Sequence, residues 1–146
     1  MKVAGRWRYR YRAVDQFGQV IDVLVSPERD KKAARRFCTR ALAAATSPTE
    51  VATDRAPVYP RIVEGLLPGA RHVTVRHVNN RVEADHGRLK ARLRPTRGMK
   101  TDRSLRITAA GHAFVQNLRR GHYELATDDT ARDRVAVAFT ELALAI

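Results

Sequence analysis

The sequence has little cysteine, few acidic residues and no apolar run long enough to span a bilayer. Cys38 is the single cysteine among 146 residues, so one chain can form neither an internal disulfide nor a zinc site built on cysteines. A helical pattern surrounds Cys38, and we expect a buried structural thiol there. The start of the chain carries no signal-peptide pattern. We therefore expect a cytoplasmic protein with no membrane segment.

The shortage of acidic residues leaves a large positive charge. Lys and Arg number 28 against 15 Asp and Glu, which gives a formal charge of +13. A charge of this size predicts attraction to a polyanion, and nucleic acid is the usual partner. DNA and RNA fit the charge equally well. The 44% hydrophobic content is enough for a buried core, and the length suits one globular domain.

Several common catalytic motifs are also absent from the sequence. It contains no Gly-rich phosphate loop and no nucleophile elbow. Its five histidines form no pair with cysteine or glutamate at zinc spacing. Glu83 and His86 make a Glu-x-x-His pair, but no second pair on another helix completes a di-iron site. These absences direct attention to carboxylates and basic residues.

A basic helix is predicted over residues 79–95. Val82, Leu89 and Leu93 share one buried stripe, and Pro95 ends the pattern. Glu83 lies in the first turn, and Lys90 follows two turns later on the same side. The two side chains could together address one metal-bound phosphate. Alternatively, the acids only favour the helix N-terminus and the bases form a solvated face.

The remaining segments predict an α/β chain. Residues 2–14 alternate as a half-buried strand, residues 15–18 form a turn, and residues 19–26 form the second strand of a hairpin. Ser26 and Pro27 predict the start of a helix that continues to about residue 45. A strand over 50–53, a helix over 57–67, a strand over 71–78 and helices over 104–120 and within 127–146 follow. Trp7, Tyr9, Tyr11 and Ala13 share one face of the first strand. The candidate core residues of the helices are Ala34, Phe37, Cys38, Ala41, Leu42, Leu105, Ile107, Phe114, Val115 and Leu118. The apolar stripe of the last helix, Val135, Phe139 and Leu142, would either cover the core or pair with a second copy of the chain.

Two features of this chain allow two interpretations each. Asp54 follows the strand over 50–53, at the end where α/β sheets place ligand-binding groups, but a turn-forming aspartate fits as well. Arg8, Arg10 and Arg12 alternate along the first strand. They could follow a phosphate backbone or form a solvated or helix-covered sheet face.

Four blocks of the sequence, residues 7–15, 53–60, 79–90 and 98–101, occur in the order found in one family. They resemble the C-terminal part of DDE transposases of insertion sequences, in the group numbered six. The resemblance implies a ribonuclease H-like α/β fold, which is a mixed sheet with an antiparallel hairpin and helices on both faces. It assigns residues 1–123 to the catalytic core and leaves residues 124–146 as a C-terminal helical extension.

The resemblance also implies a catalytic site and its partners. Asp54 would be the second acid of the triad and Glu83 the third, and together they would hold Mg²⁺ or Mn²⁺. Lys90 would act on the phosphate. The implied partner is double-stranded DNA, both the insertion-sequence ends and the target, bound by a nucleoid-associated homo-oligomer. The residues expected to contact DNA are Arg81, Arg88, Lys90, Arg92, Arg94, Arg97 and Lys100.

The first acid of the triad has no counterpart in the matching blocks. In such transposases it lies a few residues before a segment like residues 2–7, so we expect an N-terminally truncated catalytic domain with impaired activity. Asp15 and Asp22 are not placed as replacements by any motif. Three functions remain open. They are a transposase catalytic domain using two-metal phosphoryl transfer, a non-catalytic DNA-binding remnant that modulates transposition, and a basic RNA-binding module.

Overall fold

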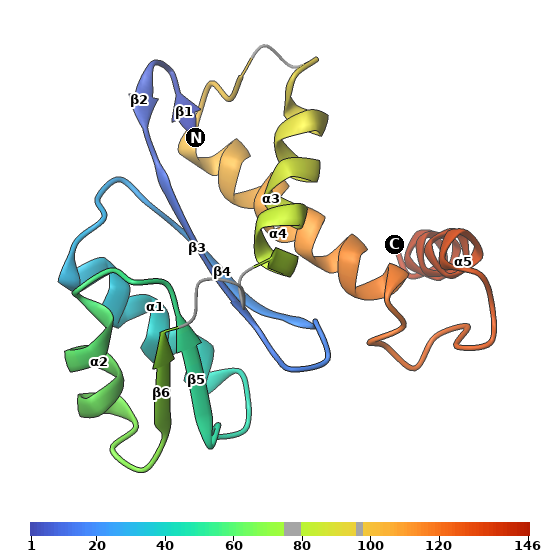
Figure 1. Cartoon of the computed structure of the whole chain (residues 1–146). Coiled ribbons are helices and arrows are strands. Elements are labelled where there is room, and N and C mark those ends of the chain that lie inside the picture. Colours follow the sequence, from blue (N-terminus) through green and yellow to red (C-terminus); the bar gives the residue numbers. More distant parts are fainter. Residues whose placement is uncertain (75–79, 96–97) are drawn as a thin grey trace.

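Among the described residues the chain begins with four short strands, continues with alternating helices and strands, and ends with three helices (Figure 1). The computed structural model describes residues 1–74, 80–95 and 98–146, without the side chains of residues 80–86. The strands are β1 (Lys2–Val3), β2 (Arg6–Trp7), β3 (Tyr9–Val14), β4 (Val20–Ser26), β5 (Glu50–Thr53) and β6 (Arg71–Thr74). The helices are α1 (Lys31–Ala43), α2 (Tyr59–Leu66), α3 (Asn80–Leu93), α4 (Asp102–Arg119) and α5 (Ala131–Leu144). This composition confirms the predicted α/β class.

Strands β3 and β4 form the predicted antiparallel hairpin. Their register shifts between Ala13 and Val14, next to the turn. The Asp15 carboxylate accepts the backbone N–H groups of Phe17 at 2.9 Å and Gln19 at 2.8 Å. Such a bond from an aspartate to the backbone two residues later is a turn-forming contact. The prediction of a turn over residues 15–18 is confirmed.

The predicted continuous strand over residues 2–14 is interrupted. Ala4 and Gly5 have positive φ angles of 44° and 78°, so the chain reverses there and β1 pairs with β2. A positive φ is uncommon for alanine, and this turn was not visible in the alternation of the sequence. The predicted inward face is broken as a result, because Trp7 is 61% exposed while Tyr11 is buried.

Two hydrophobic clusters cover opposite faces of the hairpin. Leu24 belongs to a cluster with residues of β3, α1 and α2, whereas its neighbour Val25 belongs to a cluster with β1 and α4. Adjacent residues of a strand point to opposite faces, so α1 and α4 lie on opposite faces of β4. The first cluster comprises Tyr11, Leu24, Ala33, Ala34, Phe37 and Ile62, and the second Val3, Val25, Leu105 and Ala109.

Helix α1 begins later than its predicted start signal. The Ser26 hydroxyl accepts the Glu28 N–H at 3.3 Å and closes a turn, but the helix starts at Lys31. Asp30 is the N-cap, because its carboxylate accepts the Ala33 N–H at 2.7 Å. The prediction that the helix starts at Ser26 and Pro27 is therefore wrong, because serine and aspartate both cap helices well and the cap that is used is Asp30.

Strands β5 and β6, which precede and follow α2 in the sequence, pair with each other in parallel. Their register runs from Glu50 opposite Arg71 to Thr53 opposite Thr74. The described strands form three two-stranded sheets, rather than the single mixed sheet that the family resemblance implied. The predicted strand over 71–78 is confirmed as far as Thr74, and its last residues lie outside the described part of the chain.

Helices α3 and α4 confirm the helices predicted over residues 79–95 and 104–120. Leu89 of α3 is 1% exposed, as predicted, while Val82 lies outside the described side chains. In α4, Leu105 and Leu118 are buried but Ile107 and Phe114 are exposed, which corrects the predicted core. The face of α4 toward β4 instead includes three polar residues, His112, Gln116 and Asn117.

Asn117 explains why a polar residue occupies the α4 interface. Its side-chain oxygen accepts the Val20 N–H at 2.8 Å, and its side-chain nitrogen donates to the Val20 carbonyl at 3.0 Å. Both contacts are buried, where unpaired backbone groups would be costly. The side-chain amide of Asn117 therefore provides hydrogen-bond partners for the backbone N–H and C=O of Val20, the first residue of β4.

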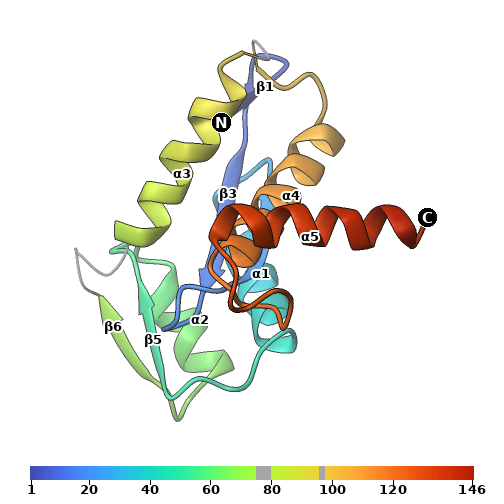
Figure 2. The same ribbon diagram turned by 90° about the vertical axis from the view of Figure 1, so that its right-hand side faces the viewer.

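Helix α5 packs against α4 and extends away from the rest of the chain (Figure 2). Of its residues only Ala138 is buried. Phe139 and Leu142 are exposed and Val135 is half-buried, so this apolar stripe does not cover the core within the chain. None of the helices in the described part of the chain combines the length and apolar character needed to cross a membrane.

Candidate catalytic edge and basic surface

Asp54 lies directly after β5, at the carboxyl end of the β5–β6 pair. One carboxylate oxygen accepts the Ala56 N–H at 3.1 Å, and the other accepts from Arg29 at 3.0 Å. The side chains of Asp54 and Arg29 are 41% and 56% exposed. Asp54 therefore holds a turn through its bond from the Ala56 N–H, which agrees with the interpretation of Asp54 as a turn-forming aspartate. It also presents its second oxygen at the surface in an exchangeable ion pair.

Two other side chains lie at this edge and were not predicted as site residues. The Nε2 atom of His72 on β6 lies 2.8 Å from the Thr53 hydroxyl on β5. Tyr59 has a pKa raised to about 12, mainly because its ring is buried and secondly because the Asp54 charge is near. Parallel pairing brings the ends of two strands together. That pairing, once recognised, was the signal that could have placed His72 beside β5, where its ring reaches the Thr53 hydroxyl.

Helix α3 carries the second predicted acid. Glu83 lies in its first turn, but the Glu83 side chain is outside the described residues. Figures 1 and 2 both show the beginning of α3 beyond the ends toward which β5 and β6 point. The chain therefore brings the turn that carries Glu83 to the carboxyl end of the β5–β6 pair, where Asp54 lies.

The second half of α3 is a basic surface. Lys90 is exposed directly after the buried Leu89, because neighbouring residues on a helix face different directions. The pKa of the Met1 amino group is lowered, first by burial and then by the charges of Lys90 and Arg10. Lys90 on α3 and Arg10 on β3 thus contribute to one positive region.

The other predicted DNA contacts lie along the same segment of the chain. Arg88, Arg92, Arg94 and Lys100 are exposed. The side chain of Arg81 and the whole of Arg97 lie outside the described residues.

Arg8 is not part of an open row of arginines. Its Nε donates to one Asp102 oxygen at 2.7 Å and its second nitrogen donates to the other at 3.0 Å. This bidentate contact lowers the pKa of the Asp102 carboxyl and joins β2–β3 to the first turn of α4. The interpretation of the row as helix-covered therefore holds for Arg8.

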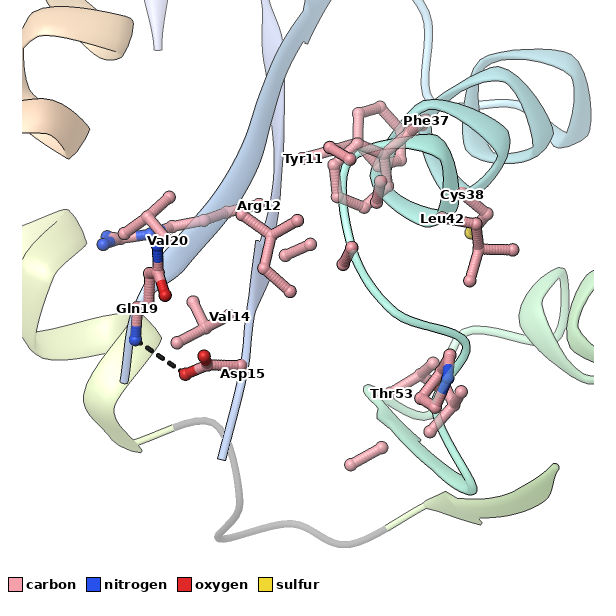
Figure 3. A pocket seen from close by; sticks show the side chains of 18 of the residues that line it. Tyr11, Arg12, Val14, Asp15, Gln19, Val20, Phe37, Cys38, Leu42 and Thr53 are labelled. Carbon is pink, nitrogen blue, oxygen red and sulfur yellow. Dashed lines mark hydrogen bonds between the residues drawn. The ribbon is translucent and has the colours of Figure 1, made fainter. Parts of the chain in front are cut away.

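Three other acids near the core have structural partners. Asp15 holds the hairpin turn, and its bond from the Gln19 N–H is drawn in Figure 3. Asp22 on β4 accepts from Arg40 of α1 at 2.8 Å, and Asp102 pairs with Arg8. None of these three carboxylates lies at the end of β5. Asp15 and Asp22 are thus engaged in structural contacts, one with the hairpin turn and one with Arg40.

The carboxylate of Asp54 is a type of ligand that a hard divalent cation binds. Carboxylate oxygens are the protein ligands that Mg²⁺ prefers, usually one or two of them with several waters. Asp54 supplies one exposed carboxylate. Within residues 1–74, 87–95 and 98–146, no group of three His, Cys, Asp or Glu side chains is assembled. A cation at Asp54 would compete with Arg29 for the same oxygen.

A large cleft separates the hairpin from β5. Its volume is about 1620 Å³, and Figure 3 shows residues of β3, β4, α1 and β5 around it. Three residues predicted as core, Cys38, Ala41 and Leu42, border this cleft and are only half-buried. The Cys38 thiol has a raised pKa because of this partial burial. The prediction of a structural thiol in a closed core is therefore corrected to a thiol on a cleft wall.

Comparison with known proteins identifies the class of protein first. A family model described as a DDE domain matches residues 1–122. The match covers most of the chain, and the chain therefore belongs to the DDE-domain family of insertion-sequence transposases. This confirms the resemblance to the sixth group of insertion sequences.

Two curated transposases are similar to this chain. The chain is similar to the Staphylococcus aureus transposase for insertion sequence-like element IS431mec, with 32% identity over 97 residues. It has the same identity over the same length to the transposase for insertion sequence element IS257 in transposon Tn4003, also from Staphylococcus aureus. Each match covers 63% of this chain and 43% of the relative. The chain thus spans less than half the length of these curated relatives. No solved structure matches it.

Proposed function

We propose that this chain is the catalytic domain of an insertion-sequence transposase, acting in DNA cleavage and strand transfer by metal-dependent phosphoryl transfer. We further propose a ribonuclease H-like arrangement, in which residues 1–123 are the catalytic core and residues 124–146 a helical extension. An antiparallel hairpin, a helix and two parallel strands joined by a second helix support this arrangement.

The observation that carries the proposal is the position of Asp54. Its carboxylate follows β5 at the end where β5 and β6 terminate, and the beginning of α3 lies beyond the same end. Groups that bind ligands in α/β proteins gather beyond the carboxyl ends of parallel strands. Asp54 and Glu83 are therefore proposed as the second and third acids of the triad.

Each residue has one proposed role. Asp54 and Glu83 hold Mg²⁺ or Mn²⁺, and bound metal ions supply activation of the attacking oxygen and stabilisation of the leaving oxygen. Lys90, two turns after Glu83, contacts a phosphate of the DNA. Arg29 occupies the Asp54 oxygen while the metal is absent and shields its charge. When DNA arrives, Arg29 is free to move to a phosphate, since its ion pair is exposed.

Double-stranded DNA is the proposed partner. The exposed basic residues of α3 and of the following segment form a surface beside the candidate site, and counterion release from DNA phosphates favours such a surface. Arg81 and Arg97 belong to the same segments and are proposed as contacts with the others. Assembly of several copies on the element ends, in association with the nucleoid, is part of this proposal.

The decisive test is metal-dependent cleavage and joining of short duplexes that carry the ends of the insertion sequence. We would compare this chain with a form extended at its N-terminus by residues carrying the first acid. The extended form should cut and join, and Asp54→Asn or Glu83→Gln should each reduce the rate by at least about 100-fold. Glu64→Gln, at an exposed position on α2, is the matched control and should retain activity.

Other outcomes would replace the proposal. If both forms bind duplex DNA and neither cuts it, a non-catalytic role in modulating transposition becomes the better account. If RNA binds more tightly than DNA and neither acid variant changes any property, the chain is a basic RNA-binding module.

A further inference from the structure

The outer face of α1 carries a basic cluster that the sequence did not single out. Four basic side chains occupy the first two turns of the helix, Lys31, Lys32, Arg35 and Arg36. All four are exposed, whereas the face toward the hairpin is buried at Ala34. We call these four residues the α1 cluster. It is separate in the sequence from the basic surface of α3.

The charges of the α1 cluster do not stabilise the helix that carries them. Lys31 and Arg35 are four residues apart, as are Lys32 and Arg36, and like charges at this spacing destabilise a helix. The helix dipole also disfavours cations near the N-terminus, and the first turn of α1 contains no acid. Within the part of the chain that the structure describes, none of the four residues forms an ion pair. Locally unfavourable residues of this kind are common at functional surfaces.

The α1 cluster lies close to the candidate catalytic edge. Arg29, two residues before α1, donates to the Asp54 carboxylate at 3.0 Å, so the start of the helix is held at Asp54. In Figures 1 and 2, α1 lies on one side of the end of β5 and the beginning of α3 lies on the other. Asp54 therefore lies between two basic helices.

Strand transfer brings two DNA segments to one site. The 3′ hydroxyl of the insertion-sequence end attacks a phosphorus of the target and loses its proton to water. The bond from that phosphorus to the target's 3′ oxygen breaks, and this oxygen takes up a proton. The attacking and leaving oxygens lie roughly in line across the phosphorus. The two duplexes therefore approach from different sides, which matches the placement of α1 and α3 about Asp54.

The composition of α1 fits a target duplex better than an insertion-sequence end. Contacts from Lys and Arg to phosphates carry no sequence information, and α1 contains no Asn or Gln, the side chains that pair with adenine. An insertion-sequence end has to be distinguished by its sequence, whereas a target duplex does not. Residues 31–36 rise about 7.5 Å along the helix, which is roughly two phosphate spacings of about 3.4 Å along one strand.

We propose that the α1 cluster binds the phosphate backbone of the target duplex, while α3 holds the insertion-sequence end. This assignment rests on the proposed transposase function, because strand transfer is the step that requires a second duplex beside Asp54. It adds Lys31, Lys32, Arg35 and Arg36 to the DNA-binding surface of the chain.

The main test separates joining from cleavage in the N-terminally extended form. The double variant Arg35→Glu/Arg36→Glu should cleave insertion-sequence ends within about twofold of the parent rate, because α3 is intact. It should join pre-cut ends to a plain duplex at least about tenfold more slowly at low target concentration, since phosphate contacts are replaced by repulsion. A higher target concentration should restore the joining rate, because the defect is one of binding.

The matched control changes the same amount of charge elsewhere. Arg119 and Arg132 are exposed on α4 and α5, and α4 lies on the face of the hairpin opposite to α1. Arg119→Glu/Arg132→Glu should leave cleavage and joining within about twofold of the parent rates. Both double variants should keep the circular dichroism spectrum of the parent, because all the altered positions are exposed.

Salt dependence gives a second readout on the chain as it stands. Each phosphate contact contributes about 0.9 to the slope of log affinity against log salt concentration. For a short duplex of unrelated sequence, Arg35→Ala/Arg36→Ala should therefore reduce the slope by about 1.8. Arg119→Ala/Arg132→Ala should leave the slope unchanged.

Other results would overturn the proposal. Equal losses of cleavage and joining in Arg35→Glu/Arg36→Glu would place the insertion-sequence end on α1 and contradict the assignment to the target. Unimpaired joining, or an unchanged salt slope, would show that the α1 cluster is only a solvated surface. If the parent extended form neither cuts nor joins, the proposed function fails and the target assignment fails with it. The salt slope then still decides whether the α1 cluster binds duplex DNA.

Discussion

The two strand pairs of this domain differ in how completely they are packed. The β3–β4 hairpin has α1 on one face and α4 on the other. The side chain of Asn117 forms hydrogen bonds with the backbone N–H and C=O of Val20 at the start of β4. The β5–β6 pair packs on α2, but Val51 and Ala52 keep exposed surface beside the cleft. The candidate site lies on the less packed pair. Stability is thus concentrated in the hairpin, whereas accessible chemistry is concentrated at the end of β5.

Two leucine truncations should show the largest contrast between these regions. Leu105 is 1% exposed in the cluster under the hairpin, so Leu105→Ala should cost about 3 kcal/mol of unfolding free energy. Leu42→Ala borders the open cleft and should cost less than about 1 kcal/mol. Urea unfolding followed by circular dichroism measures both. Similar losses for the two variants would mean that the cleft is closed and packed in solution.

Removing the amide of Asn117 should have the next largest effect. Asn117→Ala leaves the N–H and C=O of Val20 without their buried side-chain partner, which should cost about 2 kcal/mol. Arg103→Ala, at an exposed position of the same helix, is the control and should remain within about 0.5 kcal/mol of the parent chain. A loss no greater than that of the control would show that water replaces the amide at this edge.

The smallest effect concerns pH and the cleft side of the molecule. The Tyr59 pKa is raised to about 12 in the folded chain, so the unfolded chain ionises first, near pH 10. The stabilising contribution of neutral Tyr59 is therefore complete below about pH 10 and is lost as the pH rises toward about 12. Tyr59→Phe should lose less stability than the parent chain between about pH 9 and about pH 11.5. Equal losses would show that the Tyr59 hydroxyl is hydrated in the folded state.

Local signals predicted most of the elements. The periodicity of α3 and α4 was sufficient to predict both helices, and Asp15 identified the hairpin turn. The position of Asp54 after a strand was also predictable, because a short apolar strand followed by Asp-x-x-Pro is a local pattern. The location of the basic segment on a helix followed from the same periodicity.

The sequence failed where a long-range contact decided the outcome. The turn at Ala4 needs a positive φ in a residue that rarely adopts it, and its local signal is weak. Ile107 and Phe114 were predicted inside by hydrophobicity, but the pairing of Asn117 with Val20 orients a more polar face of α4 toward β4. The contacts of Asp54 with Arg29 and of Thr53 with His72 join segments 25 and 19 residues apart, and no spacing rule specifies them.

The most direct test of the candidate site is the paramagnetic effect of Mn²⁺ on the amide NMR signals of this chain and of its N-terminally extended form. A site held by Asp54 and Glu83 predicts selective broadening near Asp54, His72 and the start of α3, because paramagnetic broadening is short-ranged. The broadening should disappear in Asp54→Asn and persist in Glu64→Gln. Broadening centred on other acids, or broadening near β5 that Asp54→Asn does not change, would contradict the assignment of the catalytic edge.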